Sequence, residues 1–241
     1  MIQFFDMHTH MLCGVDDGAK SRDEMFAMLE MAYEDGTRAI CLTPHYSPYL
    51  FGDTFEQSAS AFAVLKEYVS QKHPDMRIFL GHELGYHRSG LDALNEGKCR
   101  CVAGSRYVLV DFPEAVDFFE IQSAMDLLQR SGYVPILAHT ERYRSLFKRV
   151  RWIEEFVENG GIVQLNASSV NGDWGRGAKK QWMKLIKLDL AHIISSDGHN
   201  LTSRPPKMSV CMEYLQKHCD AETVHALVWE NAWRVVQDQP L

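Results

Sequence analysis

Short apolar runs recur along the chain, and most are separated by a stretch long enough for a helix. Each run has the length of a buried strand. Seven strands that alternate with helices predict an α/β fold, a seven-stranded (β/α) barrel with parallel strands. The predicted strands lie near residues 2–7, 38–43, 77–83, 106–111, 134–139, 162–166 and 192–196.

The segments between the strands carry helix-forming patterns. Ser21 starts a capping box with Glu24 three residues later, and Gly36 is placed to end the helix that follows. The tail from 205 to 236 predicts two more helices, with two prolines near the N-terminus of the first. Further helices are expected at 55–72, 119–131, 149–159 and 177–188.

Two segments that follow strands are less regular. Residues 46–54 carry three aromatic residues and a proline, and residues 168–176 carry polar residues and two glycines. Both are predicted to be loops at the carboxyl ends of strands, where barrel enzymes form their active sites. Ordinary connecting loops are an equally weighted alternative. Their aromatic side chains, including Trp174, are interpreted as packing or lid residues rather than substrate contacts.

Length and composition favour one domain that spans residues 1–241. A chain of 241 residues, 46% of them hydrophobic, can bury a large core. No apolar run reaches the roughly 18 residues that a membrane span needs, and the first residues lack the pattern of a secretory signal. The six cysteines show no regular framework, so a reduced, cytoplasmic protein is expected.

The formal net charge of −7 gives no reason to expect nucleic acid as a partner. Part of the acidity has a local explanation, because four carboxylates stand among the residues of metal-ligand type. Three divalent ions would nearly cancel the net charge. We therefore interpret much of the negative charge as internal to a metal site.

Residues of metal-ligand type stand at or just after the ends of the apolar runs. Because side chains alternate along a strand, His8 points the same way as His10, and Asp197 the same way as His199. A lone histidine or aspartate at a strand end is more often a cap or a core group, but the recurrence along the whole chain favours a metal site. The predicted ligands are His8, His10, Asp17, His45, Glu83, Asp111, His139, Asp197 and His199.

Imidazole and carboxylate donors suit Mn, Fe, Zn, Co or Ni better than a copper–thiolate or iron–sulfur site. The donors are too many for one ion, so two or three ions that share a carboxylate are expected. Glu83, at a central strand end, is the predicted bridge. Asp16 is predicted to cap its loop rather than to bind an ion, and the pair Cys99-x-Cys101 is weak evidence for a separate site.

The combined motifs resemble those of the polymerase and histidinol phosphatase (PHP) superfamily of metallo-phosphoesterases. They are more closely similar to the bacterial manganese-dependent protein tyrosine phosphatases that are encoded with capsule and exopolysaccharide genes. This resemblance implies a distorted seven-stranded barrel of the PHP type that holds up to three ions, with Mn²⁺ as the expected metal. The matching segments, between residues 8 and 206, are HTHMLCGVDDGAKS, TPHY, GHELGY, AHTERY and SSDGHNLTSRPP.

The resemblance also implies how the ligands divide among the ions. Asp111 departs from the pattern of the resembled phosphatases, in which glutamate stands at this position, so direct binding through the shorter side chain is left open. The implied sets are His8, His10, Glu83 and Asp197 for one ion, Glu83, Asp111 and His139 for the second, and Asp17, His45 and His199 for the third.

Arg142 and Arg204 match the phosphate-binding arginines of the resembled phosphatases, and arginine offers phosphate oxygens a planar fork of donors. The predicted activity is hydrolysis of phosphotyrosine in proteins by water that the ions activate. By resemblance, the substrate is the tyrosine-rich C-terminal tail of a membrane-associated tyrosine autokinase that controls polysaccharide export. A cysteine-dependent mechanism is excluded, because no arginine stands six residues after any cysteine.

Two alternatives stay open. One is a small-molecule phosphatase such as histidinol-phosphate phosphatase, although the HTERY and SRPP segments count against it. The other is a metal-stabilised scaffold without catalytic activity, against which the complete ligand set argues. The sequence does not fix the physiological metal or the oligomeric state, and a homo-oligomer is compatible with it.

Overall fold

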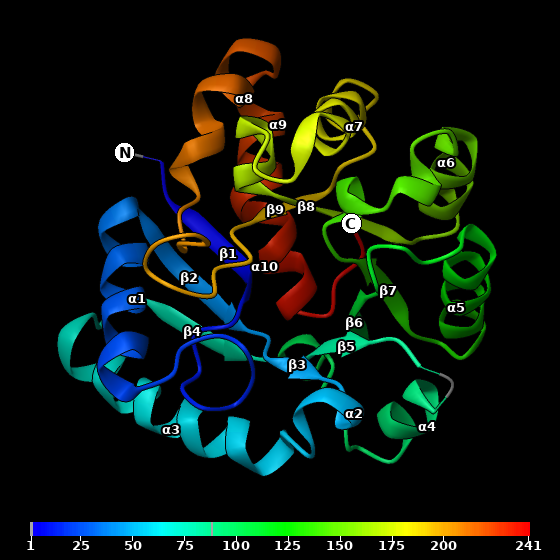
Figure 1. Cartoon of the computed structure of the whole chain (residues 1–241). Coiled ribbons are helices and arrows are strands. Elements are labelled where there is room, and N and C mark those ends of the chain that lie inside the picture. Colours follow the sequence, from blue (N-terminus) through cyan, green and yellow to red (C-terminus); the bar gives the residue numbers. More distant parts are fainter. Residues whose placement is uncertain (1, 88) are drawn as a thin grey trace.

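The computed structural model describes residues 2–87 and 89–241. Its strands are all paired in parallel and lie at the centre of the molecule, with α1, α3, α5, α6 and α7 around them (Figure 1). Within the described residues the strands are β1 (Phe4–Thr9), β2 (Thr37–Leu42), β3 (His45–Tyr46), β4 (Arg77–Leu80), β5 (Glu83–Gly85), β6 (Tyr107–Asp111), β7 (Val134–Leu137), β8 (Ile162–Asn166) and β9 (Ile193–Ser195).

These short strands form seven continuous runs, because β2 continues into β3 and β4 continues into β5. The ladder crosses both interruptions, since Gly81 N donates to Leu42 O at 2.9 Å and Glu83 N donates to Pro44 O at 3.1 Å. The barrel closes between the end of β1 and the segment after β9, where Thr9 and Gly198 form a parallel β-bridge. The predicted seven-stranded α/β barrel is confirmed, and the interruptions place two predicted ligands, His45 and Glu83, at the starts of β3 and β5.

Most helices form where the sequence predicts them. Ser21 Oγ accepts a hydrogen bond from Glu24 N at 3.2 Å at the start of α1, and Gly36 ends that helix with a left-handed φ of 111°. The helices are α1 (Arg22–Asp35), α2 (Pro48–Phe51), α3 (Phe55–Lys72), α4 (Gly90–Asn95), α5 (Phe118–Arg130), α6 (Val150–Glu158), α7 (Gly175–Lys187), α8 (Met212–His218), α9 (Ala221–His225) and α10 (Asn231–Val236).

Three expectations need correction. The loop predicted at 46–54 contains the short helix α2, and the loop predicted at 168–176 contains a 3₁₀ turn, Ala167–Asn171, and the first residues of α7. The tail forms two helical segments as predicted, α8 and a continuous helix in which a π-helical turn over Ala226–Glu230 joins α9 to α10. Its prolines do not start a helix, because Pro206 packs against Gly198 in the loop that follows β9.

The barrel interior is filled from both the strands and the C-terminal helices. Phe5 and Met7 of β1 lie inside, and the rings of Phe5 and Trp233 are 5.2 Å apart. The helix α10, red in Figure 1, lies behind the strands and closes the end of the barrel where they begin. A second apolar layer joins β2 to α1 and α3 through residues such as Leu42 and Leu65. Packing on both sides fixes the strands, so their carboxyl ends can hold polar side chains in place.

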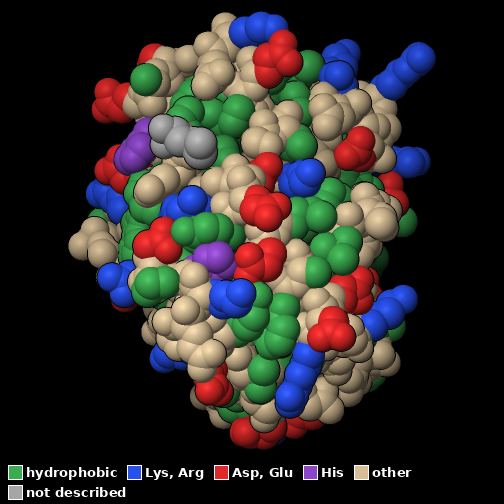
Figure 2. Space-filling view, turned by 90° about the vertical axis from the view of Figure 1, so that its left-hand side faces the viewer, with side chains coloured by type: hydrophobic (Ala, Val, Ile, Leu, Met, Phe, Trp, Pro, Cys, Tyr) green, Lys and Arg blue, Asp and Glu red, His purple; other side chains and the backbone are tan. Residues whose placement is uncertain are grey.

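The surface adds two observations. Figure 2 shows acidic and basic side chains interspersed over one face of the molecule rather than gathered by sign. Among the residues described, none of the helices combines the length with the apolar character that crossing a bilayer requires.

Candidate metal centre

The predicted ligand residues converge at the carboxyl end of the barrel. They come from the ends of different strands and from the loops that follow, so segments far apart in sequence meet there (Figure 1). We refer to these nine residues as the ligand cluster. Within the described part of the chain, ligand atoms lie within 4.8 Å of one another in four overlapping groups: His10, Asp17, His45 and His199; His8, His10 and Asp197; His8, Glu83 and His139; and His45, Glu83 and Asp111.

Glu83 lies at the centre of the ligand cluster. Its Oε2 is 3.2 Å from His8 Nε2, 3.1 Å from His10 Nε2 and 3.1 Å from His45 Nδ1. Its other oxygen, Oε1, is 3.1 Å from His139 Nε2. One buried carboxylate thus faces four imidazoles with both of its oxygens, which is the arrangement that a bridging ligand requires.

Asp197 connects the histidines to the arginines. Its Oδ1 lies 3.5 Å from the Nε2 atoms of both His8 and His10. Its Oδ2 accepts hydrogen bonds from Arg142 at 2.9 Å, from Arg204 at 2.7 Å and from Asn166 at 2.8 Å. Asp197 also has a left-handed backbone with φ of 54°, as does His139 with φ of 32°, and such strain is concentrated at functional sites.

Asp17 lies at the open edge of the ligand cluster. Its side chain is 50% exposed, and its Oδ1 lies 3.6 Å from His45 Nε2 and 3.4 Å from His199 Nε2. The other ligand groups are more deeply buried. The ligand cluster is therefore most accessible from the side of Asp17.

Asp111 lies within reach of the cluster despite its short side chain. Its Oδ1 is 3.4 Å from His139 Nε2 and accepts a hydrogen bond from the Tyr143 hydroxyl at 3.1 Å. Burial raises the pKa of Asp111 to about 7, and the negative charge of Glu83 adds to the rise. Whether Asp111 binds an ion directly stays a prediction.

The donor set fits divalent cations. Burial alone would raise the pKa of Glu83, but the charges of His8 and His45 outweigh burial and hold it well below its usual value. The buried atoms Glu83 Oε2 and His199 Nε2 form no hydrogen bond with any residue that the structure describes. Buried carboxylates and imidazoles that point at one another are costly without a compensating charge, and a shared cation supplies it.

Arg142 and Arg204 meet beside the ligand cluster, although they follow different strands. Besides sharing Asp197 Oδ2, both guanidinium groups lie over the ring of Trp174. Their side chains are only 19% and 28% exposed. The predicted pair is thus brought together at the site, while its contact with phosphate stays a prediction.

One known family matches almost the whole chain. The model of the family described as capsular polysaccharide synthesis, CpsB/CapC, matches residues 4–237. The chain belongs to the CpsB/CapC family.

Relatives and solved structures place this CpsB/CapC chain among metal-dependent phosphatases. It is 30% identical over 239 residues to the tyrosine-protein phosphatase CpsB of Streptococcus pneumoniae, covering 97% of this chain and 98% of the relative. It is 25% identical, with a TM-score of 0.87, to a chain from the crystal structures of YwqE from Bacillus subtilis and CpsB from S. pneumoniae, described as unique metal-dependent tyrosine phosphatases; the match covers 98% of this chain and 96% of that one.

A more distant likeness concerns the fold alone. The histidinol phosphate phosphatase of Lactococcus lactis is 13% identical, with a TM-score of 0.52, over 86% of this chain and 93% of that one. This CpsB/CapC chain therefore shares its barrel with an enzyme that acts on a small phosphate ester, as the PHP resemblance implies.

Several residues that orient the ligands of this CpsB/CapC chain were not predicted. Asp16 caps the loop as expected, accepting from Gly18 N at 3.0 Å, but its Oδ2 also bonds His10 Nδ1 at 2.7 Å. Gln164 Oε1 lies 3.2 Å from His8 Nδ1 and accepts from His139 N at 2.7 Å. Such partners fix the ring orientation of ligand histidines. The sequence offered one signal for the role of Gln164: it is a polar residue within the otherwise apolar run that forms β8.

Glycine is required in the DDG segment because the backbone of His10 lies against it. A Cβ atom at Gly18 would stand 1.7 Å from His10 O. We expect Gly18→Ala to displace His10, to lower the free energy of unfolding by about 1–3 kcal/mol and to reduce the bound metal. Urea unfolding and elemental analysis measure both effects.

Gly132→Ala is the matched control for the Gly18 variant. Gly132 has a φ of +86° and open space at the Cβ position, so only the backbone cost of about 1–2 kcal/mol applies. Its metal content should stay at the wild-type value. Unchanged stability and metal content in Gly18→Ala would contradict the close approach.

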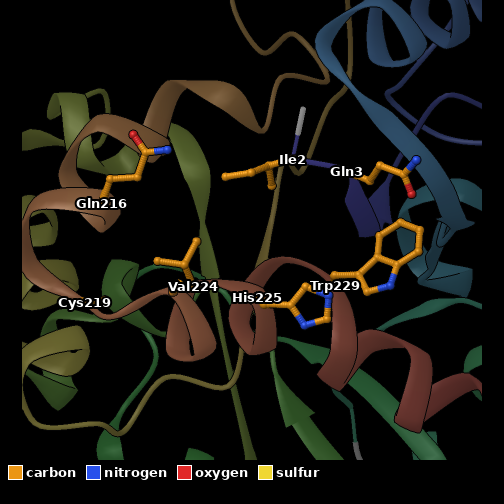
Figure 3. A pocket seen from close by; sticks show the side chains of 8 residues that line it. Ile2, Gln3, Gln216, Cys219, Val224, His225 and Trp229 are labelled. Atoms are coloured by element: carbon orange, nitrogen blue, oxygen red, sulfur yellow. The ribbon is translucent and has the colours of Figure 1, made fainter.

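An apolar cavity elsewhere in the CpsB/CapC chain does not belong to this site. The cavity of about 540 Å³ lies beside residues that precede β1, at the amino end of the strands, whereas the ligand cluster lies at their carboxyl end. Figure 3 shows side chains such as Val224 and Trp229 around it and no member of the ligand cluster. We therefore place the chemistry at the ligand cluster.

Proposed function

We propose that this protein is a metal-dependent phosphatase that hydrolyses phosphotyrosine in proteins. The observation that carries the proposal is the position of Asp197 between the histidines and the arginines. Its Oδ1 lies near three imidazoles, and its Oδ2 accepts hydrogen bonds from two arginines. A phosphate group needs cations on its oxygens and a nucleophile in line with the leaving group. The names of the CpsB and YwqE relatives support phosphotyrosine as the substrate.

Manganese is the proposed metal, because carboxylate-rich sites with imidazoles suit Mn²⁺ and the related phosphatase structures are metal-dependent. Bound divalent ions lower the pKa of water to near neutrality and offset charge on phosphate oxygens. The chain's own part is to hold the donors in place through Asp16 and Gln164. The proposed ligands are the nine members of the ligand cluster, with Glu83 shared between ions.

Arg142 and Arg204 are the proposed phosphate-binding residues. Each guanidinium uses one N–H group on Asp197 Oδ2, and its remaining donors are available to phosphate oxygens. The pair is charged at all physiological pH values, so it neutralises the phosphate without a proton transfer. Its position beside Asp197 places it next to the ligand cluster.

The proposed partner is the phosphorylated C-terminal tail of a tyrosine autokinase in the cytoplasm. Membership of a capsular polysaccharide family supports a substrate from polysaccharide export. The exposed position of Asp17 supports a flexible tail as the substrate, because such a segment can bring one phosphotyrosine to the open edge.

Comparison of two substrates tests the proposed function. Turnover of a phosphotyrosine peptide and of histidinol phosphate should be measured with Mn²⁺, Mg²⁺, Co²⁺ and Zn²⁺, and again after chelation. We expect the higher kcat/KM for the peptide, with Mn²⁺ among the activating ions and no turnover in chelator. A higher kcat/KM for histidinol phosphate, or full turnover in chelator, would overturn the proposal.

A further inference from the structure

Trp174 stands in a turn whose backbone is built around it. Gly172 and Gly175 flank it with left-handed φ values of +93° and +86°, and Gly175 N donates to Gly172 O at 2.8 Å. Residues with side chains rarely adopt such φ values. The two glycines therefore allow a tight turn that presents the indole at the start of α7.

The indole of Trp174 contacts both arginines of the site. The Cζ atom of Arg142 lies 3.8 Å from the ring centroid, and that of Arg204 lies 5.4 Å from it. Both distances fall within the range of a cation–π interaction. The same two guanidinium groups donate to Asp197 Oδ2 at 2.9 Å and 2.7 Å. Two like charges from different loops thus share one carboxylate oxygen and one aromatic ring.

These contacts leave each guanidinium with two restraints of different kinds. A hydrogen bond to Asp197 fixes one nitrogen but allows the planar group to rotate about that contact. The face of Trp174 supplies the second restraint, because both guanidinium groups lie over the ring and a guanidinium is attracted to an aromatic face. The indole also brings no charge of its own, so it holds Arg142 and Arg204 together without neutralising them toward phosphate.

We propose that Trp174 is a positioning residue that orients Arg142 and Arg204 as a fork for the phosphate of the substrate. This inference rests on the proposed function, since the fork has a purpose only if phosphate binds there. Arginine side chains that are already ordered lose less conformational freedom when a ligand binds, so the indole raises affinity for phosphate itself, whatever group the phosphate is attached to.

Substitutions at Trp174 separate the aromatic face from simple bulk. Trp174→Phe keeps a π face, whereas Trp174→Leu keeps an apolar side chain without one. The first readout is calorimetric titration of the metal-loaded protein with inorganic phosphate. We expect Trp174→Leu to weaken phosphate binding by roughly 3- to 30-fold, and Trp174→Phe to retain most of the affinity. Metal content and circular dichroism should match the wild type in both variants.

The second readout is the kinetics of an aryl phosphate and of an alkyl phosphate. A positioning role raises KM for both substrates by a similar factor in Trp174→Leu. Tyr49→Leu is the matched control, because it removes an aromatic ring that is 81% exposed on α2, and its phosphate affinity should equal that of the wild type. Wild-type phosphate affinity in Trp174→Leu would overturn the inference. A rise in KM for the aryl substrate alone would also overturn it, because Trp174 would then be a contact for the tyrosine ring.

The two proposals fail in different ways. If the wild-type protein turns over no phosphate ester, the proposed function falls, and the phosphate titration of the variants still decides the role of Trp174. If the wild type is active and the Trp174→Leu variant binds phosphate equally well, only the inference on Trp174 falls.

Discussion

Asp197→Asn is expected to lower kcat/KM for a phosphotyrosine peptide by on the order of 10³-fold, because one side chain supports both halves of the site. The substitution preserves size and shape. An amide, however, offers one acceptor oxygen and one NH₂ donor, where the carboxylate offers two acceptors. In one orientation the NH₂ group meets the donors of Arg142 and Arg204, and in the other it faces Nε2 of His8 and His10, where it cannot bind the cation that a carboxylate oxygen would share with them. Neither orientation satisfies both sides.

Metal content and turnover should be measured together on this variant. We expect Asp197→Asn to bind less metal than the wild type and to show a weaker affinity for inorganic phosphate. Asp173→Asn makes the same chemical change at an exposed aspartate of the neighbouring loop and should keep wild-type turnover. An Asp197→Asn enzyme with more than a tenth of wild-type kcat/KM would contradict the role assigned to this carboxylate.

Removal of divalent ions is expected to abolish turnover and to lower the thermal stability of the folded chain. An ion that binds only the folded state stabilises it by about 4 kcal/mol when its free concentration is a thousand times its Kd. The ligand cluster supplies the reason: its buried carboxylates and imidazoles need a shared cation to compensate their burial. Turnover and Tm should be recorded in chelator and after stepwise addition of Mn²⁺.

Glu83→Gln shows whether the stabilisation comes from the ligand cluster. Oε2 of Glu83 lies within 3.2 Å of nitrogens from His8, His10 and His45, so loss of its charge weakens the centre of the site. We expect Mn²⁺ to raise the Tm of this variant much less than that of the wild type. Glu154→Gln, an exposed position on α6, should respond like the wild type. An equal rise in Tm for wild type and Glu83→Gln would place the stabilising ions elsewhere.

The barrel and the ligand cluster could be predicted from the sequence because both depend on local patterns. Each strand is a short apolar run, and its end is marked by a change to polar residues. His8 with His10, and Asp197 with His199, are close in sequence and follow the alternation of strand side chains. A parallel barrel gathers all such ends on one side, so the topology alone brings distant ligand-type residues together.

The tail shows where local patterns mislead. Two adjacent prolines are typical of a helix start, but Pro206 packs against Gly198, where a Cβ atom would come within 2.7 Å of it. The helical turns begin later, where Asp35 accepts from the backbone of Met208 and Ser209 at 2.8 and 2.9 Å. The contact between the prolines and the loop after β9 joins the SDGH and RPP segments, and no local propensity encodes it.

The sequence by itself determined the fold class, which residues are of metal-ligand type and that no Cys-x5-Arg motif is present, because each depends on residue type and spacing. Only the tertiary structure decided how these residues are oriented. Gln164 bonds His8 across 156 residues, and Trp174 meets Arg142 and Arg204 from a third segment. Such contacts join side chains from separate strands and loops, and the packing of the whole barrel brings these side chains within a few ångströms of one another.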